Sequence, residues 1–306
     1  MSRRPMTSIA LAGAIACASA VFGETPPSPV PSPAATAAPS PAPKAPAAPP
    51  PSAKDRKRGA ALIAKAVTAM GGAAAVDGVK SLEMKATGKR QLPNGTDLAV
   101  TTRTRMVFFD RYRQDTTLPG GTMSAVLSPG AAFVMMGEAA LPLPEDERDN
   151  MKRNVRRNIV ALLQARRDKG YGAAAAGTAT VNGIPAELVK IELAGDPATL
   201  AIDPKTGRIL ELTYKGSGPT QTVGTFVMAY GDHRKVDGLN YPFTVTGTFD
   251  GKPAFSAKVE SLTINPKLED ALFTPPPPPS PPPAAPAPAA TPPAAPPAPS
   301  PTPSPM

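Results

Sequence analysis

Two segments of the chain have apolar residues spaced three to four positions apart, which is the period of an amphipathic helix. The first, residues 54–70, ends at a pair of glycines, a common helix stop. The second, residues 145–169, begins with acidic and ends with basic side chains, an order that suits the helix dipole. Its apolar stripe consists of Met151, Val155, Ile159 and Leu162. We therefore predict two helices, each apolar on one side only.

Elsewhere between residues 80 and 265, short runs of alternating apolar and polar residues are separated by turn residues such as Asn-Gly and Asp-Gly, a pattern typical of β-strands. Short turns connect consecutive strands in an antiparallel sheet. We predict an α+β domain with a strongly curved antiparallel sheet, an unclosed β-barrel of about ten strands. The two helices are expected to cover its concave face.

The ends of the chain differ from this central part in composition. Residues 1–23 contain two arginines, an apolar run and a small-residue ending, as in a secretory signal peptide. Residues 24–53 and 276–306 are rich in Pro, Ala, Ser and Thr, so we predict disordered tails. Each tail is a tether across an envelope or cell-wall layer, a solvated spacer, or a PxxP ligand for another protein. Residues 54–275 then form the single domain, in the periplasm or outer cell envelope.

The sole cysteine, Cys17, lies inside the predicted signal peptide. Its context, "AGAIAC", resembles a bacterial lipobox, in which the cysteine is lipidated after cleavage. The alternative is that Cys17 is discarded with the signal peptide. In both cases the domain has no disulfide and depends on its core for stability.

The charge of the chain restricts its partners. The formal net charge is +9 and tryptophan is absent, but no dense basic stripe is interleaved with aromatic residues, which speaks against binding to nucleic acid. An anionic membrane surface is the more plausible charged partner. The second helix could dock on anionic lipid, or its basic face could simply be solvated and internally paired. The basic residues of this helix are Lys152, Arg153, Arg156, Arg157, Arg166 and Arg167.

Catalytic motifs are not evident in the sequence. It contains no GxSxG, Walker A, HExxH or post-strand GxGxxG pattern, and His233 is its single histidine. The surrounding "GDHRKVDGLNYP" predicts an exposed position at a hairpin tip for His233. We therefore expect no enzyme activity, no cofactor and no metal site.

The apolar strand residues suggest a different role. Methionine is flexible and suits surfaces that accept varied apolar shapes. Alternation places sets of these residues on one face, which either lines a concave cavity for acyl chains or forms an ordinary core sealed by the helices. The candidate ligand-binding residues are Met106, Phe108, Met123, Phe133, Met135, Phe226, Met228, Tyr230, Phe243 and Phe249. In the first case residues 145–169 form a lid.

Three stretches together resemble a known group of proteins. They are "AMGG" followed by "VDGVKSLEMKATGK", then "LAIDPKTGRILELTY", and finally "GDHRKVDGLNYPFTVTGTFDGKPAFSAKVESLTINPKLEDALFTPP". Over most of residues 55–275 the chain is similar to the LolA/LolB-like superfamily of outer-membrane lipoprotein-sorting and periplasmic lipid-binding proteins. The resemblance implies a curved, incompletely closed barrel that holds the acyl chains of lipids or lipoproteins without a cofactor.

We therefore predict an exported, monomeric envelope protein that binds an acyl chain, lipid or lipoprotein, in the manner of a carrier. The alternative is an envelope-tethered structural or sensory adaptor that binds another protein and transports no lipid.

Overall fold

The computed structural model describes residues 49–92, 94–137, 139–193, 196–218 and 222–276. The predicted signal peptide, Cys17 and nearly all of both Pro/Ala-rich tails lie outside these ranges. In the described part of the chain, no helix has the length and apolar character needed to cross a membrane.

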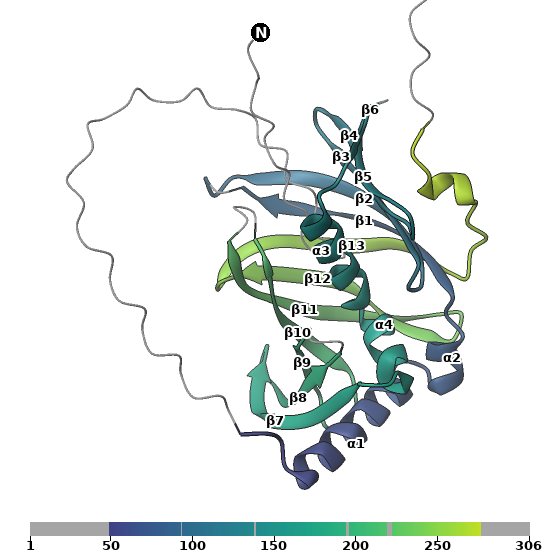
Figure 1. Cartoon of the computed structure of the whole chain (residues 1–306). Helices are drawn as coiled ribbons and strands as arrows, with labels where there is room; N and C mark the ends of the chain where they lie inside the picture. Colours follow the sequence, from purple (N-terminus) through teal and green to yellow (C-terminus); the bar gives the residue numbers. More distant parts are fainter. Residues whose placement is uncertain (1–48, 93, 138, 194–195, 219–221, 277–306) are drawn as a thin grey trace, which may run out of the picture. The chain divides into compact units, whose positions relative to one another are not determined.

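One sheet of thirteen strands forms the framework, and every neighbouring pair is antiparallel. The strands are β1 (Ser81–Gln91), β2 (Asp97–Val107), β3 (Arg111–Leu118), β4 (Gly121–Leu127), β5 (Ala132–Met136), β6 (Ala139–Pro142), β7 (Gly172–Val181), β8 (Ile184–Glu192), β9 (Ala198–Ile202), β10 (Ile209–Ser217), β11 (Val223–Val236), β12 (Leu239–Phe249) and β13 (Lys252–Ile264). Their order is β6-β5-β4-β3-β2-β1-β13-β12-β11-β10-β9-β8-β7, so the sheet is open, with β6 and β7 at its edges (Figure 1).

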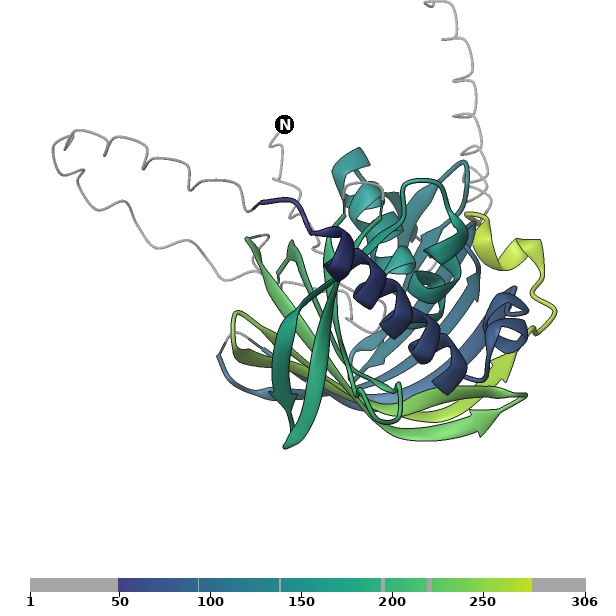
Figure 2. The same ribbon diagram turned by 90° about the horizontal axis from the view of Figure 1, so that it is seen from below.

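The sheet curves strongly, and helices lie on its concave side (Figure 2). The helices are α1 (Ala53–Ala69), α2 (Ala73–Asp77), α3 (Glu145–Arg156) and α4 (Ile159–Gln164), with two short 3₁₀ segments, η1 (Ala165–Arg167) and η2 (Asp270–Phe273). A capping box between Ser52 and Asp55 starts α1. Close packing holds α1 against β7, because a Cβ on Gly59 would lie 2.6 Å from the Ala174 Cα.

The predicted curved, open antiparallel sheet with helices on its concave face is confirmed, but the numbers of strands and helices differ from the prediction. Thirteen strands replace the expected ten or so, and four α-helices replace two. The predicted helix over residues 145–169 is interrupted after Arg157, because Asn158 adopts an extended conformation (ψ 134°). The Asn158 side chain accepts a hydrogen bond from the Val160 N–H at 3.0 Å and thus caps a new helix, α4.

The position of His233 differs from the prediction. It lies within β11 opposite Pro242 and is half-buried, while Asp237 and Gly238, both at positive φ, form the hairpin turn. Burial, and secondarily the charge of Arg208, lower the pKa of His233 below its ordinary value.

Candidate ligand-binding site

The concave face carries most of the apolar residues that the sequence singled out. Met106, Met123, Phe226, Met228 and Phe243 are buried in one large cluster, and Phe108, Tyr230 and Phe249 pack against it. Strand alternation thus brings these residues into one packed cluster.

Two of the candidates lie elsewhere. Phe133 is buried on the other face of the sheet, in a small cluster with Val126 and Phe273, and Met135 packs against that cluster. The covering residue, Phe273, comes from η2 near the end of the described chain. These two side chains therefore do not line the concave interior.

The helix residues predicted to form a lid belong to the same inner cluster. Met151 and Val155 lie on α3, and Ile159 and Leu162 lie on α4. The side chains of Met106 and Leu163 are fully enclosed at 0% exposure. The described interior is thus packed by the protein's own strand and helix side chains.

α4 is the more firmly fixed of the two helices. The Gln164 side-chain amide donates hydrogen bonds of 2.8 Å to the carbonyl oxygens of both Val76 and Val79. Immediately after α4, Arg166 forms a forked pair with the Asp77 carboxylate, with distances of 2.8 and 2.7 Å. Forked arginine–carboxylate pairs have specific geometry, so these contacts tie α4 and η1 to α2.

Buried polar residues on β2 and β3 were missed by the sequence reasoning. Thr104 and Gln114 are 1% and 3% exposed, and the Gln114 amide donates a hydrogen bond of 3.4 Å to the Thr104 hydroxyl. Thr102 and Thr116, which face each other across the same two strands, are also buried. The α3 residues Asn150 and Asn154 are also buried. The alternation of threonines in β2 was a signal that an inner-facing polar row exists. The interior is therefore amphipathic rather than uniformly apolar.

A cavity of about 390 Å³ opens beside α3. Its volume lies within the range of about 300–1,000 Å³ that is usual for small-molecule sites. Leu162 and Ala198 provide buried apolar walls, and both also belong to the inner cluster. The other lining residues are Asp149, Lys152, Arg153, Arg156, Arg157, Leu193 and Asp196. The cavity thus combines apolar walls with a set of basic side chains.

Arg157 is the buried cation of this cavity, with a side chain only 6% exposed. Its guanidinium donates to Asp196 at 2.5 Å, to the Lys215 carbonyl at 3.0 Å and to Asn154 at 3.1 Å. It also stacks 4.3 Å from the ring centre of Tyr214. These contacts fix the junction between α3 and α4 to β10 and to the segment before β9.

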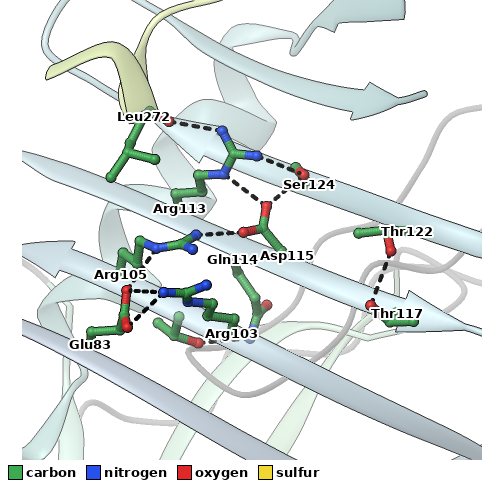
Figure 3. Close-up of polar contacts among 11 residues, drawn as sticks. Glu83, Arg103, Arg105, Arg113, Gln114, Asp115, Thr117, Thr122, Ser124 and Leu272 are labelled. Carbon is green, nitrogen blue, oxygen red and sulfur yellow. Dashed lines mark hydrogen bonds and ion pairs between the residues drawn. The ribbon is translucent and has the colours of Figure 1, made fainter. Parts of the chain in front are cut away.

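The opposite face of the sheet carries a network in which the arginines are paired with acids (Figure 3). Glu83 accepts from Arg103 and Arg105, and Asp115 accepts from Arg105, Arg113 and Ser124. Burial alone would raise the pKa values of Asp115 and Glu83, but these hydrogen bonds outweigh it and lower both.

Arg113 also donates to the Leu272 carbonyl, which attaches η2 to this outer face. We interpret this network as structural, because its carboxylates are engaged and ionised.

Burial also changes the pKa values of tyrosines in the interior. Burial raises the pKa of Tyr214 to about 12 and raises those of Tyr230 and Tyr241 as well, so these phenols stay protonated at neutral pH. Across the described ranges, no group of three or more His, Cys, Asp or Glu side chains is placed to hold a metal ion.

Comparisons with known proteins identify similar folds. No family model matches the sequence, and no curated protein does. A DUF1329 family protein from Desulfovibrio piger matches 71% of this chain and 97% of its own, with 13% identity and a TM-score of 0.49. A LolA superfamily protein from Nitrosomonas europaea gives the same coverage, with 9% identity and a TM-score of 0.47.

A protein from Vibrio parahaemolyticus described as an outer membrane lipoprotein-sorting domain has 9% identity, a TM-score of 0.46 and again 71% and 97% coverage. All three TM-scores lie below 0.5, and the identities do not exceed 13%. The likeness concerns the fold alone, so the chain's own residues have to indicate its function.

Proposed function

We propose that this chain is an exported envelope protein that binds the acyl chain of a lipid or lipoprotein on the concave face of its sheet, as a carrier would, and that it catalyses no reaction. One observation carries the proposal: Leu162 and Ala198 both line the cavity beside α3 and belong to the buried inner cluster. An acyl chain that enters the cavity therefore meets apolar side chains that continue into the interior.

Entry into the interior requires the displacement of a helix. Arg157 holds the C-terminal end of α3 to β10, so the movement that we propose is a swing of α3 about this junction. α4 is tied to α2 by Gln164 and Arg166, whereas the apolar anchors of α3 are Met151 and Val155. We therefore narrow the predicted lid from residues 145–169 to α3.

The free energy gained by burying an acyl chain can offset the cost of displacing α3. Exposing two such side chains costs about 3–6 kcal/mol, at about 1.5–3 kcal/mol each. Burying an acyl chain returns about 0.8 kcal/mol per methylene, so about eight methylenes offset the cost of displacing α3. Longer chains then bind with net affinity. Flexible methionines on the inner face, such as Met106 and Met228, can repack around the guest.

The proposal is tested by lipid uptake. Full-length protein isolated from a bacterial envelope should carry lipid in native mass spectrometry and should take up a fluorescent fatty acid. Leu193→Trp, which fills the cavity, should weaken this uptake several-fold. Leu188→Trp on β8 is the matched control and should leave uptake unchanged. Leu188 does not line the cavity and packs against a separate small cluster, which consists of Val181, Ala186, Ala201 and Leu210. Protein without lipid that also fails to take up the probe would refute the proposal.

A second candidate function is an adaptor that binds another protein. The packing of the described interior by the protein's own side chains favours it, because such a domain needs no guest. Deleting residues 276–306 distinguishes the two functions. Loss of localisation or of a co-purifying partner, together with unchanged lipid uptake, would assign the tail to an adaptor role.

A further inference from the structure

The cavity beside α3 contains more positive than negative charge. Its lining includes four basic and two acidic side chains. Both acids are already engaged, because Asp149 pairs with Lys152 at 3.0 Å and Asp196 pairs with Arg157 at 2.5 Å. Arg153 and Arg156 also line the cavity, and neither is in an ion pair with another residue of the described ranges. The cavity lining thus has a net formal charge of +2, because its two carboxylates offset two of its four cations.

These two arginines are placed to act together. They are three residues apart on α3, a spacing that puts side chains on the same side of a helix. Both are exposed, whereas the apolar walls of the same cavity, Leu162 and Ala198, are buried. On the outer face of the sheet, by contrast, arginines such as Arg103, Arg105 and Arg113 are paired with carboxylates.

Arg157 provides a second, independent indication of an anion. Its side chain is more than nine-tenths buried, and it lines the cavity. Its Nε–H has no hydrogen-bond partner among the described residues, and protein atoms cover it, so an anion reaches it only when neighbouring side chains shift. An unsatisfied buried donor on a charged group is costly, and an anionic oxygen is the acceptor that relieves it best.

We propose that this cavity binds the phosphate group of an acyl lipid, with the phosphate against Arg153, Arg156 and Arg157 and the chain directed towards Leu162 and Ala198. A phosphate monoester carries about −1.5 to −2 charges at neutral pH, which matches the net charge of the cavity lining. The planar guanidinium fork also fits phosphate oxygens in a bidentate manner. This inference rests on the proposed function and names the headgroup class of its ligand.

The test uses a matched pair of ligands that differ only in the phosphate. Binding of a monoacylglycerol and of the same monoacylglycerol phosphate to the full chain is measured by titration calorimetry, below their micellar concentrations. Glycerol 3-phosphate serves as the ligand without a chain. We expect the phosphorylated lipid to bind at least tenfold more tightly than the neutral one, and glycerol 3-phosphate to bind at least tenfold more weakly than the phosphorylated lipid.

Two double variants assign the effect to the cavity. Arg153→Gln/Arg156→Gln should abolish the preference for the phosphorylated lipid while binding of the neutral lipid persists. Arg56→Gln/Lys57→Gln removes the same charge from exposed positions of α1 and should retain the preference.

The outcomes separate this inference from the proposed function. Equal binding of the two lipids, or the same loss of preference in both double variants, would overturn the phosphate site and leave acyl-chain binding intact. Glycerol 3-phosphate binding as tightly as the lipid would also overturn it, because the site would then recognise a free phosphate. Failure of both acyl ligands to bind would refute the proposed function itself.

Discussion

Replacing Arg157 by methionine tests how the junction between α3 and α4 is held. Methionine keeps a flexible side chain of similar reach but removes the charge and the donors. The change leaves Asp196, whose side chain is 23% exposed, without its partner at 2.5 Å. It also removes the hydrogen bond to the Lys215 carbonyl and the stacking on Tyr214.

Removing one partner of a buried ion pair typically costs about 3–5 kcal/mol. Because Asp196 keeps some contact with water, we expect the lower end of this range for Arg157→Met, about 3 kcal/mol. Urea unfolding of the full chain, extrapolated linearly to zero denaturant, measures this loss. Asp196→Asn and the variant that carries both substitutions complete a double-mutant cycle. The coupling energy between Arg157 and Asp196 should exceed about 1 kcal/mol.

The matched control is Arg156→Met, which removes an exposed charge one residue away and should change the free energy of unfolding by about 0.5 kcal/mol or less. Hydrogen exchange should also become faster in α3 of Arg157→Met, because its attachment to β10 is lost. A loss below about 1 kcal/mol, or one equal to that of Arg156→Met, would show that Arg157 does not hold this junction.

Three further predictions concern the framework. Burial and the charge of Arg208 lower the pKa of His233 in the folded protein, so the unfolded chain binds this proton first as the pH falls below about 6.5. The free energy of unfolding should therefore decrease from about pH 7.5 to pH 5. His233→Asn should make the midpoint of urea unfolding depend less on pH over this range. Gly59→Leu should destabilise the fold by about 2 kcal/mol or more in thermal unfolding, since a Cβ there would lie 2.6 Å from the Ala174 Cα; an unchanged midpoint would contradict the close packing of α1 on β7. Asp115→Asn should cost about 2 kcal/mol at pH 7 and progressively less towards pH 3, because the hydrogen bonds that lower its pKa stabilise the ionised form; a loss independent of pH would refute this.

Local patterns in the sequence predicted most of the sheet. Alternating residues and turn pairs located the strands, and the turn residues Asn182, Asp237 and Asp250 do adopt positive φ. Strand β6, just before α3, was not predicted from the sequence. It has only four residues and ends in a proline, so it shows little alternation of apolar and polar residues. The break at Asn158 was hidden because apolar periodicity continues across it, although an asparagine before an apolar run is a known cap signal.

The candidate site could be predicted only in part, for reasons of distance along the chain. Alternation groups Phe226 with Met228 correctly, but it cannot tell which face of β5 will be covered by η2, which follows about 135 residues later. The burial of Arg157 likewise depends on Asp196 and Tyr214, which lie in other elements. From the helix pattern alone, Arg157 was indistinguishable from its exposed neighbours.

The central claim is that acyl chains occupy the concave side of the sheet, and the methionines allow it to be tested directly. With ¹³C-methyl methionine in the full chain and an unlabelled acyl lipid, isotope-filtered nuclear Overhauser spectra detect contact between lipid and methyl groups. The account predicts cross-peaks from the acyl chain to Met106, Met151 and Met228 and none to Met135, which lies on the outer face. Cross-peaks to Met135 alone, or bound lipid without contact to the three inner methionines, would contradict it.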